Sequence, residues 1–153
     1  LLLKEVIAEQ QMLSIVVIDL DHFKKINDQF GHLWGDKVLQ AAAQVLKQNV
    51  RKSDIVGRFG GEEFILVLPN TYETEALAIA ERIRYQLASL SLQDDQQRAI
   101  PVSGSLGLVS KQPALDTAFN TLVHFADLAL YRAKANGRNQ VRIHQENTNM
   151  HTQ

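Results

Sequence analysis

Apolar residues recur along the chain with two different periods, and each period predicts a different kind of element. Continuous runs rich in β-branched residues and bounded by turn residues predict buried strands. Glycine-bearing turns between two such runs indicate a hairpin, and the stretch 57–68 has this form around Gly60-Gly61-Glu62-Glu63. The other predicted strands are 14–20 (SIVVIDL), 100–110 (IPVSGSLGLVS) and 140–144 (QVRIH).

Apolar residues spaced three and four apart predict the helices. Gly31 and Gly35 break this spacing, so residues 21–36 are expected to be mostly loop around one short helical turn. Gly137 stands where the C-cap of the last helix belongs. The predicted helices are 37–50, 71–90 and 117–136, and 1–10 is expected to be the end of an amphipathic helix.

The order of these elements predicts the fold class. Strands alternate with helices around one hairpin, which favours a mixed α/β (α+β) sheet covered by helices, close to the ferredoxin-like βαββαβ plan with additions. A length of 153 residues suits a single domain spanning 1–153. Because the sequence opens inside a helix on three leucines, we expect it to be an N-terminally truncated piece of a longer polypeptide.

Charge and composition narrow the classes of partner. With 16 basic and 17 acidic residues the net charge is −1, so no overall field attracts nucleic acid or an anionic membrane, and phosphate binding must be local. The absence of cysteine excludes disulfides, thiolate metal sites and a cysteine nucleophile. No apolar stretch approaches the roughly 20 residues of a membrane helix. We expect a soluble, cytoplasmic domain with no nucleic-acid or membrane contact of its own.

Acidic residues gather at the predicted end of the first strand. Asp19 ends that strand and Asp21 follows, and pairing with the hairpin at 57–68 would bring Glu62 and Glu63 toward them. Three or four converging carboxylates would repel one another unless a hard divalent cation neutralised them. Magnesium suits this role because it keeps few protein carboxylates and completes its shell with water and phosphate oxygens. The alternative, which the glutamate pair alone would favour, is an exposed acidic turn.

Two pairs of basic residues are candidates for binding phosphate. Lys24 and Lys25 follow the acids, and Lys134 and Arg138 lie four apart, which would place them on one face of the last helix. The alternative for the second pair is the favourable interaction of cations with the C-terminal end of a helix dipole. Taken alone, the spacing favours that alternative.

Asn27, His32 and Asp36 lie in the glycine-broken segment and are candidates for contacting a nucleotide. An aspartate accepts hydrogen bonds from guanine N1–H and the N2 amine, whereas an adenine edge leaves it unpaired. The alternatives are helix capping by Asp36 and turn formation by Asn27. A zinc site at His32 is not expected, since no cysteine accompanies it.

Arg51 and Asp54 stand three apart in RKSD, where the helix 37–50 is expected to end. Arginine suits bidentate contact with guanine O6 and N7, and aspartate suits the guanine donors. The alternative is a solvated helix end, which the spacing alone favours.

Taken together, these segments resemble the GGDEF domain, the catalytic module of bacterial diguanylate cyclases. They occur in the family's order and spacing, cover most of the chain from residue 14 onward, and include GGEEF, an accepted variant of the signature. Family members usually carry a DxLTGLxNRR-like segment and a sensory or dimerising domain before this point, so the longer protein could be membrane-anchored. The matching segments are DLDHFKKIND (19–28), GHLWGD (31–36), RKSD (51–54), RFGGEEF (58–64) and ADLALYRAKANGRNQV (126–141).

The resemblance implies a mixed five-stranded sheet wrapped by helices and a magnesium-dependent reaction that joins two GTP molecules into cyclic di-GMP and releases two pyrophosphates. Because a twofold-symmetric product forms from two identical substrates, it also implies a homodimer during catalysis. The alternative is a catalytically silent module that binds GTP or cyclic di-GMP and regulates a partner.

Individual roles follow from the same resemblance. Asp19, the backbone carbonyl of Leu20 and Glu62 would bind Mg²⁺, with Mn²⁺ as an alternative and with Glu63 assisting. Glu62 is also the candidate base for the ribose 3′-hydroxyl. Lys24 would stabilise charge on the transferring phosphoryl group.

The remaining roles concern the nucleotide. Terminal phosphates would be held by Lys134 and Arg138, and the guanine and ribose by Asn27, His32 and Asp36. RKSD matches the family's RxxD product-inhibition site. Arg51 and Asp54 are therefore expected to bind cyclic di-GMP, with Arg82 as a secondary contact.

Overall fold

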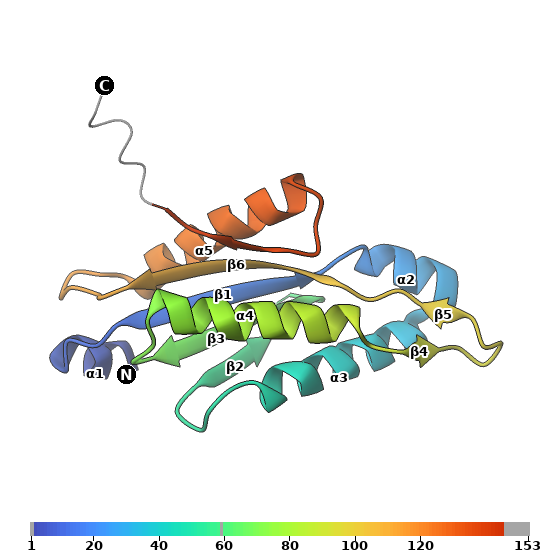
Figure 1. Ribbon diagram of the computed structural model, residues 1–153, viewed down its shortest axis with the longest axis horizontal. Helices are drawn as coiled ribbons and strands as arrows, with labels where there is room; N and C mark the ends of the chain where they lie inside the picture. Colours follow the sequence, from blue (N-terminus) through green and yellow to red (C-terminus); the bar gives the residue numbers. More distant parts are fainter. Residues whose placement is uncertain (1, 59, 146–153) are drawn as a thin grey trace.

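The computed structural model describes residues 2–58 and 60–145, and its centre is a five-stranded mixed sheet (Figure 1). The strand order is β2-β3-β1-β6-β7, with β6 and β7 parallel and the other neighbours antiparallel. The predicted mixed five-stranded sheet is therefore confirmed. The strands are β1 (Leu13–Leu20), β2 (Ile55–Arg58), β3 (Glu63–Pro69), β6 (Gly104–Lys111) and β7 (Val141–Ile143).

Helices cover both faces of this sheet (Figure 1). Side chains of α3 (His32–Gln48) and α4 (Glu73–Ala88) pack on one face, and those of α1 (Leu2–Ala8) and α5 (Phe119–Ala135) on the other. Every residue of the central strand β1 is buried, because its alternating side chains enter the two cores in turn. This explains why the strand is a continuous apolar run.

The segment 21–36 was expected to be mostly loop, and that prediction is wrong. It forms α2 (Phe23–Phe30) and the first turn of α3, separated at Gly31, whose φ is +90°. Gly35 does not break the helix that contains it. A Cβ at Gly35 would lie 1.8 Å from Oδ1 of Asn27, so this glycine permits the close approach of α2 and α3.

The predicted strand 100–110 is also shorter than expected. β5 (Ala99–Ile100) pairs with β4 (Leu92–Gln93) in a small separate hairpin, and β6 begins only at Gly104. The buried Asp94 organises this hairpin by accepting hydrogen bonds from the backbone N–H groups of Gln96 and Arg98 and from Arg98 Nε. One buried carboxylate therefore orders the turn between β4 and β5.

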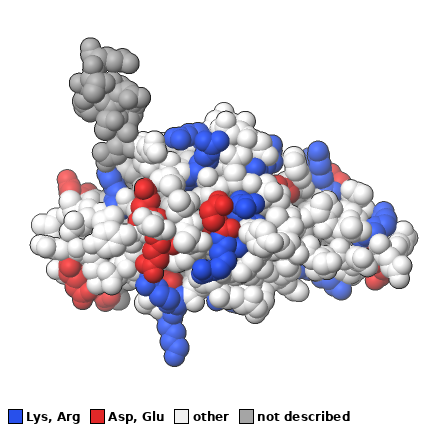
Figure 2. Space-filling view, in the orientation of Figure 1, with Lys and Arg blue, Asp and Glu red and all other residues white. Residues whose placement is uncertain are grey.

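The surface carries both signs of charge in close proximity. Figure 2 shows acidic and basic side chains beside one another on the visible face, over the region where α4 lies in Figure 1. Within the described ranges, no helix is long and apolar enough to cross a membrane.

Candidate active site

The acidic turn and the end of the first strand meet at one edge of the sheet, as predicted. Antiparallel pairing of β1 with β3 places Asp19 opposite Glu63. The backbone N–H of Leu20 donates a 3.2 Å hydrogen bond to the carbonyl of Glu62. The β2–β3 hairpin therefore holds its carboxylates beside the tip of β1.

Two glutamates at this edge have pKa values above the ordinary range. Burial, and after it the negative charge of Asp19, raises the pKa of Glu62 above its ordinary value, and Lys134 acts in the opposite direction. The pKa of Glu63 is raised for the same reasons, with Asp127 as a further nearby negative charge. The edge therefore holds more negative charge than its neighbours neutralise.

Lys134 supplies the main positive charge at the edge. Its Nζ donates a hydrogen bond to Oδ2 of Asp19, a residue 115 positions away in the sequence and only 7% exposed. The Lys134 side chain itself is 37% exposed, so its ammonium group can leave this carboxylate without leaving water. A divalent cation bound at Asp19 would take over the neutralising role of Lys134.

A cavity of about 200 Å³ lies at this edge. It brings together three of the four predicted metal ligands, the predicted catalytic lysine and both predicted phosphate ligands from α5 and the segment after it, whereas Glu63 is not among its lining residues. Lys25 is not among its lining residues. The cavity is lined by Asp19, Leu20, Asp21, His22, Phe23, Lys24, Glu62, Lys134 and Arg138.

Asp21 does not join the acidic group, which corrects the expectation of three or four converging carboxylates. Its Oδ1 accepts a hydrogen bond from Ser105 Oγ, and its Oδ2 accepts from Ser103 Oγ and the backbone N–H of Asn139. Among the described residues, no three His, Cys, Asp or Glu side chains are grouped so that they could hold a metal ion by themselves.

The donor set at the edge nevertheless fits a hard divalent cation. Asp19 and Glu62 carry carboxylate oxygens, and Leu20, whose backbone carbonyl is the third predicted ligand, lines the same cavity. Mg²⁺ characteristically takes one or two protein carboxylates and leaves its other positions to water and phosphate. A set of two carboxylates and a carbonyl suits Mg²⁺ or Mn²⁺ better than Zn²⁺, which favours nitrogen and sulfur ligands.

Lys134 and Arg138 line the same cavity, but they do not share a helix face. The last helix ends at Ala135, and Gly137 follows with φ of +112°. Arg138 and Asn139 then adopt left-handed conformations, with φ of +62° and +47°. Arg138 therefore reaches the cavity from a turn, which spacing along an ideal helix could not predict.

The predicted base-contacting residues lie on α2 and α3, and one of them, Asp36, lines a second cavity. Asn27 is on α2, and His32 and Asp36 are in the first turns of α3. The second cavity, about 380 Å³ in volume, is lined by Asp36, Leu39, Gln40, Ala43, Arg58 and Phe64.

Arg58 and His22 are cavity residues that sequence reasoning missed. Arg58 lines the second cavity, and its guanidinium donates a 2.6 Å hydrogen bond to the carbonyl of Gly61, at the acidic turn. Its place two residues before the first signature glycine could have drawn attention to it. His22 lines the first cavity with a φ of +55°. Nothing in the sequence marks that conformation.

The RKSD residues form a closed polar cluster at the other end of β3. Arg51 donates to both carboxylate oxygens of Asp54, at 3.1 and 3.3 Å, and to Pro69 O and Thr71 Oγ1. The bond to Asp54 raises the pKa of Arg51. Arg82 is bonded elsewhere, through Nε to Oδ1 of Asn49 at 2.5 Å.

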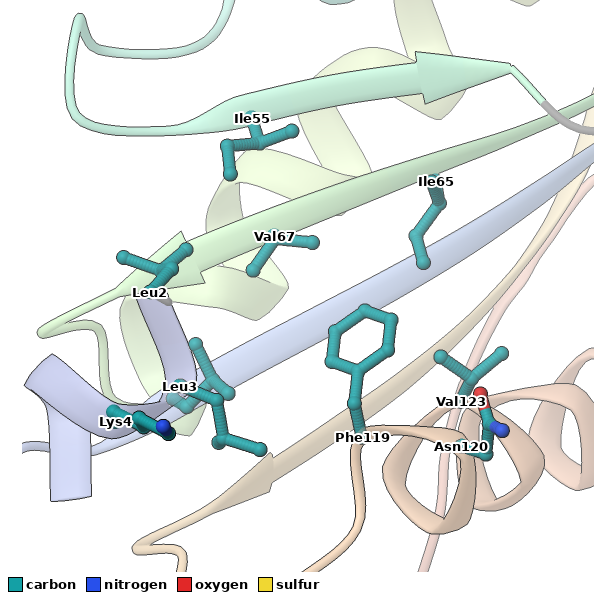
Figure 3. Close-up of a pocket in the computed structure, with 10 residues that line it drawn as sticks. Leu2, Leu3, Lys4, Ile55, Ile65, Val67, Phe119, Asn120 and Val123 are labelled. Atoms are coloured by element: carbon teal, nitrogen blue, oxygen red, sulfur yellow. The ribbon is translucent and has the colours of Figure 1, made fainter.

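A larger cavity, of about 700 Å³, has a different character (Figure 3). Its lining is almost wholly apolar, and none of the predicted site residues contributes to it. It offers no carboxylates for metal chemistry, and Lys4 and Asn120 are the only polar side chains among its lining residues. The lining residues are Leu2, Leu3, Lys4, Leu13, Ile55, Ile65, Val67, Phe119, Asn120 and Val123.

Comparison with protein families gives a match over residues 1–140 to "Diguanylate cyclase, GGDEF domain". Among curated relatives, "Diguanylate cyclase A" of Treponema denticola is 43% identical over 139 residues, covering 91% of this chain and 37% of the relative. "Diguanylate cyclase DosC" of Escherichia coli is 43% identical over 131 residues, covering 86% of this chain and 28% of the relative. The chain thus spans only about a third of the length of these proteins.

Solved structures of similar architecture agree with this match. The GGDEF domain of DgcB from Caulobacter crescentus, in complex with c-di-GMP, superposes with a TM-score of 0.88 at 28% identity, covering 94% of this chain and 84% of that one. The active GGEEF domain of a diguanylate cyclase from Vibrio cholerae gives 0.85 at 37% identity, covering 94% and 89%.

Proposed function

The chain belongs to the GGDEF family of diguanylate cyclases, and from this we propose that it condenses two GTP molecules into cyclic di-GMP with release of two pyrophosphates. The single observation that carries the proposal is the cavity at the tip of β1. It brings Asp19, Leu20 and Glu62 together with three cationic side chains, those of Lys24, Lys134 and Arg138, from three distant parts of the sequence. Metal-assisted phosphoryl transfer needs this combination of positioning and charge neutralisation more than it needs a covalent nucleophile.

We infer that Mg²⁺ or Mn²⁺ binds between Asp19, the Leu20 carbonyl and Glu62, with Glu63 beside them. Bound there, a divalent ion neutralises phosphate charge and eases deprotonation of a nearby hydroxyl. The nearness of two carboxylates supports the assignment, because after burial the negative charge of Asp19 is the next cause that raises the pKa of Glu62.

The protein's own groups account for the rest of the reaction. Glu62 accepts the proton of a ribose 3′-hydroxyl, whose oxygen attacks the α-phosphorus of the other GTP. The bond from that phosphorus to the pyrophosphate oxygen breaks, and the same exchange on the second GTP closes the ring. Lys24 stabilises charge on the transferring group.

Lys134 and Arg138 hold the terminal phosphates in this proposal. Lys134 exchanges the Asp19 carboxylate for phosphate oxygens when the nucleotide and its metal ion bind, so its charge stays paired throughout. Asn27, His32 and Asp36 contact guanine and ribose, and Asp36 beside the second cavity gives the preference for guanine over adenine.

We further propose that two copies face each other during the reaction, each holding one GTP, since the product is twofold symmetric. The chain acts as the catalytic domain of a longer protein. Arg51 and Asp54, with Arg82 on α4, bind cyclic di-GMP and hold domains where their GTP sites cannot meet. Because Nε and Nη2 of Arg51 already bond within the chain, a product that uses these donors must compete with the bonds to Asp54 and Thr71.

The test is to incubate the protein, joined to a dimerising coiled coil, with Mg²⁺ and either GTP or ATP, and to identify the products by mass. Cyclic di-GMP from GTP, with no cyclic dinucleotide from ATP, is the expected result. Binding of GTP or cyclic di-GMP without turnover would instead support a regulatory module. Binding of neither would remove the proposal.

A further inference from the structure

Asp21 is a buried carboxylate that the proposed reaction does not use. It is 6% exposed, and both of its oxygens are occupied by protein donors at 2.6 to 3.0 Å: Ser105 Oγ on one, Ser103 Oγ and the Asn139 N–H on the other. Its own N–H donates to the Ser103 carbonyl at 2.9 Å. Asp21 thus joins the end of β1 to the start of β6 and to the turn after α5.

The turn that Asp21 holds is conformationally demanding. Arg138 and Asn139 are consecutive non-glycine residues with positive φ, and such conformations persist only when their surroundings hold them. The Asn139 N–H belongs to the peptide that directly follows Arg138, and it is this N–H that Asp21 accepts. Arg84 of α4 adds a second tether, a 3.2 Å hydrogen bond to Oδ1 of Asn139.

We propose that Asp21 is a positioning residue that fixes the peptide after Arg138 and so aims the Arg138 side chain at the terminal phosphates of the nucleotide. The proposal rests on the proposed function, since it needs a triphosphate in the cavity that Arg138 lines. It differs from a metal-ligand role, because an Asp21 that acts through hydrogen bonds can be replaced by an amide, whereas a charged ligand cannot.

The chemistry of asparagine makes this distinction testable. In Asp21→Asn, the amide oxygen can accept from the Asn139 N–H and Ser103. The amide NH₂ can donate to Ser105, because a hydroxyl serves as donor or acceptor. In Asp21→Ala, the Asn139 N–H loses its acceptor and the turn is released. Asp21→Asn should therefore keep the hydrogen bond to the Asn139 N–H, and Asp21→Ala should lose it.

The experiment measures calorimetric Kd values in Mg²⁺ for 3′-deoxy-GTP and 3′-deoxy-GMP, which lack the attacking hydroxyl and are not turned over. Asp21→Ala should weaken the triphosphate about tenfold and the monophosphate less than about twofold, the size of effect expected when a charged hydrogen bond is misplaced. Asp21→Asn should stay within about threefold of the wild type. In an Arg138→Met background, Asp21→Ala should add less than about twofold.

Asp94→Ala is the matched control. Asp94 is also a buried carboxylate with two backbone donors and a side-chain donor, but it organises the β4–β5 hairpin. Its loss should lower thermal stability and leave both Kd values unchanged. Hydrogen exchange at the Asn139 amide should speed up in Asp21→Ala and not in Asp94→Ala. If Asp21→Ala does not fold, Asp21→Ser, whose hydroxyl is too short to reach that amide, is measured in the same way.

The outcomes separate this inference from the proposed function. A wild-type protein that fails to bind 3′-deoxy-GTP removes both. If the wild type binds it, the positioning role is overturned by equal weakening of the two ligands. It is also overturned if the full Asp21→Ala penalty persists without Arg138, or if exchange at Asn139 is unchanged. In each of those cases the cyclase proposal still stands.

Discussion

The tip of β1 and the RKSD turn each place a basic side chain beside an acidic one. The two sites differ in how many of their charged groups have a partner within the chain. At the RKSD turn, Arg51 contacts Asp54, Pro69 and Thr71, and the Asp54 side chain is shielded from solvent. At the tip of β1, one lysine faces Asp19 while Glu62 and Glu63 remain with raised pKa values.

The difference shows where ligand binding can lower the free energy most. At the RKSD turn, a ligand that binds the same Arg51 donors must first displace their hydrogen bonds within the chain. An edge with excess negative charge gains from any cation that arrives. Metal and phosphate chemistry therefore belongs at the tip of β1, and the RKSD turn suits a ligand that competes for arginine.

The largest effect should come from Glu62→Gln. We expect cyclic di-GMP formation to fall about 10³-fold or more, because the change removes both a metal ligand and the proposed base. Without metal, the Glu62→Gln variant should be at least as stable as the wild type. The raised pKa of Glu62 means that its ionised form is disfavoured in the folded state, and glutamine carries no charge. Product mass and the thermal midpoint are the measurements.

Glu73→Gln, an exposed acid in the first turn of α4, is the control for Glu62→Gln and should leave the rate unchanged. A Glu62→Gln protein whose rate of cyclic di-GMP formation stayed within about tenfold of the wild-type rate would contradict this comparison. The negative charge at the tip of β1 would then have no role in catalysis.

Lys134→Met should have a smaller effect, with opposite signs for two ligands. GTP binding should weaken about tenfold, because a phosphate contact is lost. Mn²⁺ binding without nucleotide should tighten, because the metal no longer competes with an ammonium group for Asp19. Titration of Mn²⁺ by electron paramagnetic resonance measures the second effect, and weaker Mn²⁺ binding in Lys134→Met would contradict the exchange of partners.

Arg51→Ala should have the smallest effect on the initial rate, less than about twofold, while the inhibition constant for cyclic di-GMP rises about tenfold or more. Stability should fall by about 1 kcal/mol, because the Pro69 carbonyl and Thr71 lose a donor. Lys52→Ala, an exposed neighbour in the same turn, is the control. An unchanged inhibition constant would show that the cluster is structural only.

The sheet and the acidic edge were predictable because local signals carry them. β1 is apolar throughout since both its faces are covered, and the glycines of GGEE mark a hairpin whatever surrounds them. Pairing that hairpin with β1 then forces Glu62 and Glu63 toward Asp19. Each of these steps depends on a few neighbouring residues.

The remaining features depend on contacts between distant segments. Gly35 looks like a helix breaker until Asn27 is seen against it. Asp21 looks like a fourth metal-binding acid until Ser105, 84 positions later, is found to donate to it. The turn that carries Arg138 is left-handed because of contacts that no helical spacing records. Sequence reasoning placed these residues near the site but could not assign their partners.

The central claim is that Asp19, Leu20 and Glu62 share one divalent ion beside the triphosphate. The most direct measurement is anomalous scattering from Mn²⁺ in crystals grown with 3′-deoxy-GTP. The account predicts a peak about 2.1 Å from a carboxylate oxygen of Asp19, from the Leu20 carbonyl and from a carboxylate oxygen of Glu62, with Lys134 turned to the phosphates. A peak bound by phosphates alone, with Lys134 still paired to Asp19, would contradict it.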